Sequence, residues 1–475
     1  MPIALAKADK KILAKRRAIT NGLRKLIGKD RIIADDVGRM VFSSDALQAY
    51  RQVPLLVVLP ESTREVATVL KYCSEKGIKV VPRGAGTSVT GSALPSEDSI
   101  VICLSRMDKV LTVNYEDRIA RVQAGVTNQG ITDAVAGNGF FYAPDPSSKV
   151  ACTIAGNIAT NAGGPGCLKY GMTSNNVLGL KLVTIDGEVL ELGGSYLDPM
   201  EYDLRSLILG SEGQLGIVTE ATVRILPRPE SSRPILIGFA SPVTAAACVG
   251  AIVSSGIMPV SLEYMDRAAI QICEEFAQAG YPANAEALLI VEVEGSPVEI
   301  DRKLADINKI ARNHEPIIVK ISENDHESAE IWKGRNTIAG AIGRISDFYV
   351  VDGAIPTGML PQVLEEVSGI CRKYELRVAN IFHAGDGNLH SLVLYDANNP
   401  QEVEKVEAAG AEILKYCVKV GGSLTGEHGI GIEKRDLMPE QFTEHELMLQ
   451  MRIKDAFDPD WLLNPGKVFP LEMHR

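Results

Sequence analysis

Three segments rich in small residues constrain the fold of the first half of this sequence. The segment PRGAGTSVTG (82–91) follows the apolar run IKVV, GSEGQLGIVTEATV (210–223) leads into another strand-like run, and residues 144–171 between them end in a third glycine-rich stretch. Such loops leave backbone N–H groups available and let a ligand approach closely, because glycine has no Cβ. Together they predict a β-rich domain that holds one large ligand with several polar groups. The alternative is that the glycines only relieve crowding between strands.

The succession of apolar runs predicts an α+β protein. Residues 1–52 form a predicted N-terminal helical segment, and residues 53–230 contain short β-rich runs, including VTIDGEVL, a predicted hairpin with a type I′ turn at Asp186–Gly187. Residues 231–420 alternate strands and helices, which predicts an antiparallel sheet with helices on one face, and 421–475 are Gly-rich and then helical. The predicted strands of this third part are 235–240, 259–264, 287–293 and 316–321, and its predicted helices are 243–255, 297–313, 327–341 and 360–374.

Charge and cysteine usage exclude several classes of protein. The net charge of −11 argues against nucleic acid as a partner, because phosphate binding needs a basic field. The eight cysteines contain no CxxC pair, so we expect neither a disulfide framework nor an iron–sulfur cluster, and predict a reducing, cytoplasmic compartment. Residues 234–262 are uncharged, but Pro and Gly interrupt them, which favours strand–helix–strand over a transmembrane segment.

The N-terminus is strongly basic. Nine Lys and Arg residues against two Asp occupy the first 30 positions. We predict a helix that packs on the body of the protein and leaves its cations in solvent. Peripheral contact with a membrane surface and a transit peptide are the alternatives. The predicted apolar face consists of Ile12, Ile19, Leu23, Leu26 and Ile27.

Several motifs of the sequence occur together in one known family. PRGAGTS, the PDPSS…IAGNIATNAGG block, GSEGQLGIVTEATV, FHAGDGNLH, TGEHGIGIEK and NPGK resemble, in the same order, the vanillyl-alcohol oxidase / p-cresol methylhydroxylase (PCMH) class of FAD enzymes. Within this class the chain is most similar to the group of FAD-linked glycolate oxidase catalytic subunits and D-lactate dehydrogenases. The resemblance implies a two-part PCMH-type FAD-binding domain, a ferredoxin-like α+β cap domain for the substrate, and a C-terminal helical segment that returns to the flavin, with the active site between the two domains.

The resemblance also implies which residues hold FAD. Residues 82–91 would wrap the pyrophosphate, and the other two glycine-rich segments would line the rest of the cofactor. All seven histidines lie at or beyond residue 314, so a histidine of the FAD-binding segment cannot attach the flavin, and we predict non-covalent FAD. The implied FAD-binding residues are Pro82, Arg83, Gly84, Ala85, Gly86, Thr87, Ser88, Gly91, Pro144, Thr153, Gly156, Asn157, Thr160, Gly163, Gly164, Gly213, Gly216, Ile217, Val218 and Asn464.

Histidines and carboxylates gather in two C-terminal motifs. IFHAGDGNLHSL places His383 and His390 on either side of a Gly-Asp-Gly-Asn turn, so that a hairpin would point both to the same side. TGEHGIG adds the neighbours Glu427 and His428. His383, His390 and Glu427 predict a divalent metal site for Zn, Mn or Fe, which the resemblance also implies. The alternative is a pair of histidines satisfied by hydrogen bonds near a turn.

The remaining candidates match the reaction that the resemblance implies. This reaction is the FAD-dependent oxidation of a small 2-hydroxy acid, glycolate or D-lactate, to the 2-oxo acid by hydride transfer to flavin N5, with electrons passed to a partner or quinone rather than NAD. His428 is the predicted base, because an imidazole with its ordinary pKa of roughly 6.5 is substantially neutral at about pH 7 and can accept a proton. Arg335, three residues after Trp332, is the predicted carboxylate clamp, with a surface arginine as the alternative.

Other readings of the motifs stay open. Relatives with diacid substrates carry a lysine where this chain has Val350, which favours glycolate or lactate over D-2-hydroxyglutarate. Asp386 and Asn388 either orient metal ligands or only form the turn.

Three alternative functions stay open: a non-catalytic flavin-binding subunit, a metal-dependent hydrolase without flavin and an ether-lipid synthase. The complete set of His383, His390, Glu427 and His428 argues against the non-catalytic subunit. The sequence predicts an iron–sulfur partner subunit or a quinone as acceptor and leaves a homo-oligomer open.

Overall fold

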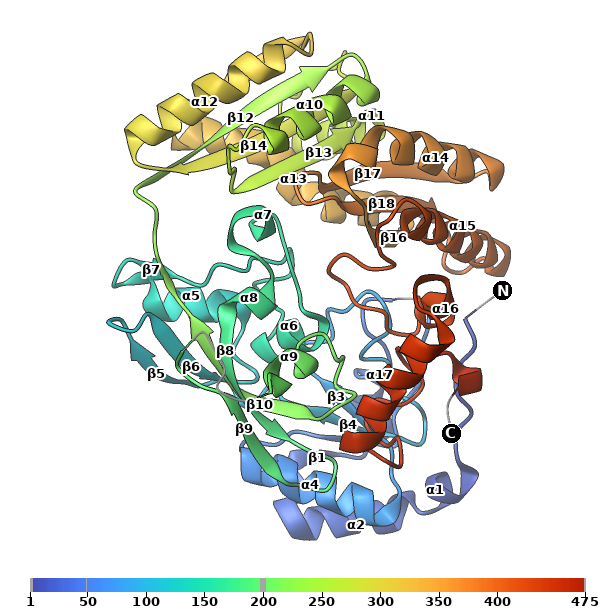
Figure 1. Ribbon diagram of the computed structural model, residues 1–475. Coiled ribbons are helices and arrows are strands. Elements are labelled where there is room, and N and C mark those ends of the chain that lie inside the picture. The colour runs from blue at the N-terminus through green and yellow to red at the C-terminus, as the bar shows by residue number, and fades with distance from the viewer. Residues whose placement is uncertain (1–2, 48, 197–201, 474–475) are drawn as a thin grey trace. The chain divides into compact units, whose positions relative to one another are not determined.

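The computed structural model describes residues 3–47, 49–196 and 202–473 and divides the chain into two compact units (Figure 1). The first unit contains Ile3–Gly163, Gly171–Arg228 and the residues from Glu427 on. The second unit contains Gly164–Tyr170 and Pro229–Gly426. The chain therefore leaves the first unit at Arg228 and returns to it at Glu427. Residues 164–170 lie in the second unit, whereas the sequence analysis included them in 53–230.

The first unit is built on two main sheets. The smaller has the order β1-β2-β4-β3, with β2 and β3 both parallel to β4, and the larger is antiparallel with the order β5-β6-β10-β8-β9. The strands are β1 (Ile32–Ile33), β2 (Leu56–Val58), β3 (Val80–Arg83), β4 (Ile100–Cys103), β5 (Val110–Asn114), β6 (Ile119–Gln123), β8 (Val177–Val183), β9 (Val189–Gly193) and β10 (Ile217–Arg224), with a separate pair of β7 (Phe140–Phe141) and β11 (Leu226–Pro227).

Helices cover these sheets. The sequence of α4 (Thr63–Lys76) shows why such a helix forms where it does. The Ser62 side chain accepts the Glu65 N–H and starts the helix, and Gly77, at φ +62°, ends it. Buried residues at helical spacing, such as Val66 and Leu70, join the core of the first unit, where each such side chain contributes about 1.5–3 kcal/mol. The other helices are α1 (Lys10–Ala14), α2 (Arg16–Ile27), η1 (Lys29–Arg31), α3 (Asp36–Met40), α5 (Asn128–Ala136), α6 (Ile154–Thr160), α8 (Thr173–Asn176), α9 (Leu204–Ile208), η3 (Arg435–Leu437), α16 (Met438–Gln441), α17 (Glu444–Phe457) and η4 (Leu471–Met473).

The basic N-terminus forms two helices that pack on the first unit, as predicted. Ile12, Ile19 and Leu23 are buried in its core, and α2 contacts α4. The prediction was wrong for Leu26, which is 49% exposed. The helix restarts after Lys15, so the apolar face is shorter than one continuous helix would give.

The predicted hairpin at VTIDGEVL is confirmed, but its turn differs. Strands β8 and β9 pair antiparallel up to Val183 and Val189. Of the two predicted turn residues only Gly187 has a positive φ, at +84°, whereas a type I′ turn needs positive φ at both. Gly187 N–H donates to Thr184 O at 2.9 Å, so the turn is one residue longer at its start than the sequence suggested.

The second unit contains a seven-stranded antiparallel sheet with the order β15-β12-β14-β13-β17-β18-β16. The predicted strands and helices of this region are confirmed to within a few residues. The strands are β12 (Ser231–Phe239), β13 (Ser261–Asp266), β14 (Ala287–Gly295), β15 (Ile318–Ile321), β16 (Asp347–Ala354), β17 (Arg377–His383) and β18 (Asn388–Tyr395), and the helices are α7 (Cys167–Tyr170), α10 (Pro242–Ser254), α11 (Arg267–Ala277), α12 (Pro297–Arg312), α13 (Asp325–Ile345), η2 (Thr357–Met359), α14 (Leu360–Lys373) and α15 (Pro400–Lys419).

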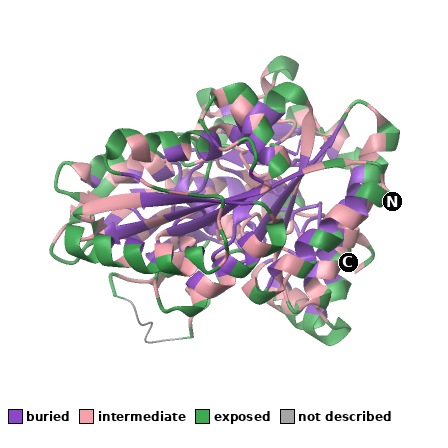
Figure 2. Cartoon of the chain, turned by 90° about the horizontal axis from the view of Figure 1, so that it is seen from above, coloured by how far each residue is buried: buried purple, intermediate pink, exposed green. Residues whose placement is uncertain are grey.

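Helices cover both faces of this sheet, so the expectation of helices on one face was wrong. Leu288 and Ile290 belong to a core cluster with α11 and α13. Leu289 and Val291 point the opposite way and are equally buried, and α10 and α12 contact the same strand. Figure 2 shows strands coloured mainly as buried and helices with exposed outer residues. The continuous apolar run ALLIV is typical of a strand that is buried on both sides.

The uncharged stretch 234–262 forms the predicted strand, helix and strand, namely β12, α10 and β13. Among the described residues, no helix combines the length and the apolar character needed to cross a bilayer.

Candidate active site

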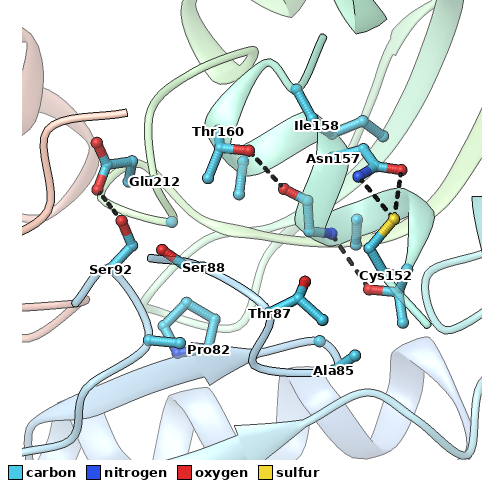
Figure 3. Close-up of a pocket in the computed structure, with 18 of the residues that line it drawn as sticks. Pro82, Ala85, Thr87, Ser88, Ser92, Cys152, Asn157, Ile158, Thr160 and Glu212 are labelled. Atoms are coloured by element: carbon cyan, nitrogen blue, oxygen red, sulfur yellow. Dashed lines mark hydrogen bonds between the residues drawn. The ribbon is translucent and has the colours of Figure 1, made fainter. Parts of the chain in front are cut away.

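A cavity in the first unit is lined by all three glycine-rich segments (Figure 3). The first segment follows β3, the second forms α6 with the loop before it, and the third precedes β10. Sixteen of the twenty residues expected from sequence line it: Pro82, Arg83, Gly84, Ala85, Gly86, Thr87, Ser88, Thr153, Gly156, Asn157, Thr160, Gly163, Gly213, Gly216, Ile217 and Val218.

The loop after β3 offers a row of backbone donors. In the described parts of the chain, no backbone N–H of residues 84–89 donates a hydrogen bond to another protein atom. Gly86 and Gly213 have φ of +74° and +72°, a conformation that glycine adopts without strain. A Cβ at Gly213 would collide with the ring of Pro82, so the cavity wall requires glycine there.

Four expected residues do not line the cavity. Gly91 packs against Ile432, and the Pro144 carbonyl accepts a hydrogen bond from Asn128. Gly164 belongs to the second unit. Asn464 is buried behind the wall, where its side-chain amide donates to Ser92 O at 3.0 Å and to Glu212 O at 2.6 Å.

Glu427 and His428 line the same cavity as the glycine-rich segments. His428 Nε2 lies 3.9 Å from Glu427 Oε1, and the His428 side chain is 23% exposed. The residues that follow are anchored to Glu212, which accepts the Ile430 N–H at 2.6 Å. The predicted base therefore faces the space that the three loops enclose.

Glu212 and Ser92 also line the cavity, and neither was predicted from the sequence. The Ser92 hydroxyl donates to Glu212 Oε2 at 2.6 Å, as Figure 3 shows. Burial raises the pKa of Glu212, and its hydrogen bonds from Ser92, Ile430 and Gly431 counteract that rise. Its position within GSEGQLG, as the charged residue of a glycine-rich loop, was the available signal.

The second unit brings His383 and His390 together on one face of its sheet. His383 ends β17 and pairs with Asn388, the first residue of β18. His390 lies two residues further along β18, so its side chain points to the same side. The two ring centroids are 5.2 Å apart with an edge-on arrangement, which confirms the hairpin geometry predicted from sequence.

A buried carboxylate connects His383 with Arg335. Glu263, in the middle of β13, lies 2.7 Å from His383 Nδ1 through Oε1 and accepts from Arg335 Nε at 2.8 Å through Oε2. Burial raises the pKa of Glu263, but the charges and hydrogen bonds of His383 and Arg335 outweigh it and hold the pKa below its ordinary value. Arg335 is 9% exposed, so it is not the surface arginine that the sequence left as an alternative.

Asp352 is a second buried carboxylate near the histidines. It pairs with His390 across β16 and β18, and its Oδ1 lies 3.5 Å from His390 Nε2. Its Oδ2 accepts the Thr425 hydroxyl at 2.6 Å and the Gly426 N–H at 3.1 Å. Asp352 thus fixes the residue that precedes Glu427 in the chain.

Asp386 and Asn388, the two candidate residues of the turn between His383 and His390, make a hydrogen bond that is typical of a turn. Asp386 is exposed and its Oδ1 accepts the Asn388 N–H at 3.3 Å. Asn388 is buried beside Gly426, where a Cβ would collide with the Asn388 side chain. Their role in orienting metal ligands stays a prediction.

Residues 54–193 match the family described as FAD binding domain, and residues 228–468 match the family described as FAD linked oxidases, C-terminal domain. The second match covers more than half of the chain. This chain belongs to the FAD-linked oxidases. It is therefore an oxidoreductase, and the class predicted from its motifs is confirmed.

Three relatives match this FAD-linked oxidase over nearly its whole length and their own. "Glycolate oxidase subunit GlcD" of Escherichia coli (strain K12) is 45% identical over 97% of this chain and 92% of that protein. The protein of the same name from Bacillus subtilis (strain 168) is 35% identical over 95% and 97%. "D-lactate dehydrogenase" of Anaerostipes hadrus is 30% identical over 94% and 96%.

Solved structures share the fold of this FAD-linked oxidase at low sequence identity. A p-cresol methylhydroxylase with bound substrate superimposes with a TM-score of 0.82 at 17% identity, over 98% of this chain and 99% of that chain. An alkyldihydroxyacetonephosphate synthase superimposes with a TM-score of 0.76 at 18% identity, over 98% and 86%. The α+β fold with a PCMH-type FAD-binding domain is therefore confirmed.

The cavity of the FAD-linked oxidase fits its cofactor. The N–H groups of residues 84–89 suit the acceptor oxygens of a pyrophosphate. Apolar side chains of the wall, among them Ile158, Ala162 and Ile217, suit a flat ring system. The first unit contains no histidine before Glu427, so histidine attachment of the flavin to the glycine-rich segments is excluded by the sequence.

The donor set around His383 and His390 fits a divalent metal. A carboxylate bound to the second ring nitrogen is the usual support of a metal-binding histidine, and Glu263 provides it for His383. Two imidazoles with carboxylate oxygens suit Zn, Mn or Fe. The third predicted ligand, Glu427, belongs to the first unit and stays a prediction from sequence.

Proposed function

We propose that this FAD-linked oxidase oxidises a small 2-hydroxy acid, glycolate or D-lactate, to the corresponding 2-oxo acid. The relatives named glycolate oxidase subunit and D-lactate dehydrogenase support this substrate class. When bound, FAD supplies the acceptor for the two electrons and the hydrogen that leave the α-carbon. The rest of the reaction consists of binding the carboxylate, holding the α-carbon in place and removing the hydroxyl proton.

The observation that carries this proposal is that His428 lines the same cavity as the glycine-rich segments. A neutral imidazole beside a flavin cavity can accept the hydroxyl proton while the α-hydrogen leaves. We assign this proton to Nε2 of His428, because the Glu427 carboxylate at 3.9 Å stabilises the resulting imidazolium. This arrangement also disfavours a flavin-binding subunit without chemistry, which would not need a base in the cavity.

Arg335 is proposed to bind the substrate carboxylate. Its Nε is occupied by Glu263, and its two terminal nitrogens have no hydrogen-bond acceptor among the described residues. These two nitrogens form the edge of the guanidinium that binds carboxylates in a bidentate manner. Val350 is apolar and packs against the core cluster beside α11 and α13, so it offers no cation for a second carboxylate. We therefore favour glycolate or lactate over D-2-hydroxyglutarate.

His383, His390 and Glu427 are proposed to hold a divalent metal. Such an ion would stabilise negative charge on the substrate oxygens. Hydrogen bonds from Thr425 and Gly426 to Asp352 orient the segment that leads to Glu427.

The acceptor of the electrons is proposed to lie outside this chain. The eight cysteines include no CxxC pair, so we expect an iron–sulfur cluster to be held by another protein. The name of the GlcD relatives describes a subunit, which supports a partner protein as the acceptor. We propose that this partner carries such a cluster, and a quinone is the second candidate. We further propose a cytoplasmic location; peripheral contact of α1 and α2 with a membrane stays the alternative.

Anaerobic mixing tests the proposal. The purified chain is mixed with glycolate, D-lactate, L-lactate and D-2-hydroxyglutarate, and loss of the visible flavin band is followed. We expect fast bleaching with glycolate or D-lactate. A colourless protein that does not retain added FAD, or one that no 2-hydroxy acid bleaches, would refute the proposed function. Flavin that stays on the protein after denaturation would refute non-covalent binding.

A further inference from the structure

We infer that Glu263 is a positioning residue that orients the substrate clamp Arg335 and the metal ligand His383 through its two carboxylate oxygens. The inference rests on the proposed function, because it assigns Glu263 a role toward the groups that bind the substrate and the metal. No motif in the sequence indicated this residue.

The geometry places Glu263 between the two side chains. Glu263 and His383 are directly paired across β13 and β17, so their side chains point to the same face of the sheet. Arg335 approaches that face from α13. Glu263 is fully buried, and its two oxygens lie 2.7 Å from His383 Nδ1 and 2.8 Å from Arg335 Nε. Each oxygen therefore serves a different partner.

The contact with His383 selects its tautomer. A carboxylate only accepts hydrogen bonds, so the proton of the neutral imidazole lies on Nδ1. The lone pair is then on Nε2, the nitrogen that would ligate a metal. Glu263 orients Arg335 in a similar way. It accepts the hydrogen bond from Arg335 Nε, which leaves the two terminal nitrogens of the guanidinium for a carboxylate of the substrate.

Fold stability alone does not explain a carboxylate at this position. Met265, two residues along β13, and Ile381, two residues along β17, belong to the apolar cluster that α11 and α13 cover. An apolar side chain would suit the same face, and buried ion pairs are often no more stabilising than apolar groups of similar volume. The buried charge is therefore better explained by the two side chains that it orients.

The test compares three variants of the full chain with bound FAD. Glu263→Gln keeps the size but can offer only one acceptor oxygen, so either His383 or Arg335 loses its bond. Glu263→Met removes both bonds and preserves packing, and it replaces Glu263→Gln if that variant fails to fold. Glu292→Gln is the matched control, because Glu292 is a partly buried carboxylate of the neighbouring strand β14 that accepts from Ser232 at 2.6 Å.

Two quantities are measured for each variant: the affinity for Zn²⁺ or Mn²⁺ by equilibrium dialysis, and the dependence of anaerobic flavin bleaching on D-lactate or glycolate concentration. For Glu263→Gln and Glu263→Met we expect metal affinity about 10–100-fold weaker. We also expect a substrate dissociation constant that rises more than the limiting rate falls, with flavin content unchanged. Glu292→Gln should match the wild type in both measurements.

The possible outcomes distinguish a failure of the role of Glu263 from a failure of the proposed function. If the wild type binds metal and is bleached, and both Glu263 variants match it in metal affinity and substrate dissociation constant, the role of Glu263 is refuted while the proposed function stands. A loss of folding stability with unchanged affinities refutes it equally. If the wild type itself is not bleached by any 2-hydroxy acid, the proposed function fails, and the role of Glu263 fails with it.

Discussion

Glu212 accepts the backbone N–H of Gly431 with both of its carboxylate oxygens, at 3.2 and 2.9 Å. The same carboxylate receives the Ile430 N–H and the Ser92 hydroxyl. It thereby attaches the residues after His428 to the loop that precedes β10. Glu212 thus anchors in the cavity wall the segment that follows the predicted base, His428.

Glu212→Gln should loosen this attachment. The glutamine amide offers one acceptor oxygen instead of two, which leaves a buried N–H without a partner at a cost of about 1–3 kcal/mol. We expect the free energy of unfolding in urea to fall by that amount and flavin bleaching to slow. Glu191→Gln is the control, because the Glu191 side chain is 68% exposed and forms surface ion pairs with Arg121 and Lys181, and such pairs contribute little. Equal losses in both variants would contradict the role of Glu212.

His428→Ala should retain FAD but slow its reduction. The side chain is one of many that line the cavity, so cofactor affinity should change little. If the imidazole is the base, the rate of anaerobic bleaching should fall by roughly 10²–10⁴-fold. His445→Ala, in exposed α17, is the control and should behave as wild type. Near-normal bleaching of His428→Ala would exclude it as the base.

Gly213→Ala should weaken FAD binding. Its positive φ of +72° strains any residue with a Cβ, and that Cβ would collide with the Pro82 ring in the cavity wall. We expect purified protein with substoichiometric flavin, measured from the ratio of visible to ultraviolet absorbance. Gly137→Ala is the control, because a Cβ there meets open space and Gly137 has a helical φ of −60°. Full flavin content in Gly213→Ala would show that the wall tolerates a methyl group.

The stability of the protein should depend on pH through Lys467. Burial lowers its pKa to about 7, although Asp45 and Glu212 nearby oppose this, and the unfolded value is 10.5. Below about pH 7 the buried charge destabilises the folded state. Between pH 7 and 10.5 only the unfolded state keeps the proton, so stability rises with pH.

Lys467→Met should remove most of this alkaline rise, by a few kcal/mol at most. The measurement is urea unfolding at a series of pH values, with Lys76→Met at the exposed end of α4 as the control. Asp45 acts in the opposite sense at lower pH, because burial raises its pKa to about 6 and stability falls as pH rises from 3.8 to 6. A variant that keeps the wild-type slope above pH 7 would contradict the assignment to Lys467.

His390→Ala should lower the metal content. Elemental analysis of the native protein is expected to give one Zn, Mn or Fe per chain, and the variant substantially less, because it loses one of two imidazoles. His314→Ala is the control, since His314 follows α12 away from the hairpin. Substoichiometric metal in native protein and in His390→Ala alike would end the metal proposal.

Most of the secondary structure could be predicted from local patterns in the sequence. β14 and α12 were predicted to within two residues of their observed bounds, because Gly295 and Pro297 mark the end of one and the start of the other. β12 begins four residues earlier than predicted, because Pro234 lies inside the strand and not before it. The type of turn at Asp186–Gly187 did not follow from the dipeptide, because a longer turn with one left-handed glycine satisfies the same residues. The second helical layer over β14 was missed, although ALLIV has no polar side that could face water.

Site residues that belong to a contiguous motif could be predicted from the sequence. Site residues that are brought together only by pairing between distant strands could not. His383, His390 and the three glycine-rich loops are visible as short motifs. Glu263 is separated from His383 by 120 residues, and only the register of β13 with β17 brings them together. Asn464 was expected at the cofactor and instead binds two backbone carbonyls behind the cavity wall.

That position of Asn464 has a consequence for synthesis of the chain. The Asn464 N–H donates to Val80 O at the start of β3, and the Asn464 side chain donates to the carbonyls of Ser92 and Glu212. A nascent polypeptide on the ribosome reaches this residue only after the whole second unit has been translated. The two loops that Asn464 joins are thus tied together only after the second unit has been translated, and a chain truncated before Asn464 should be purified as apoprotein.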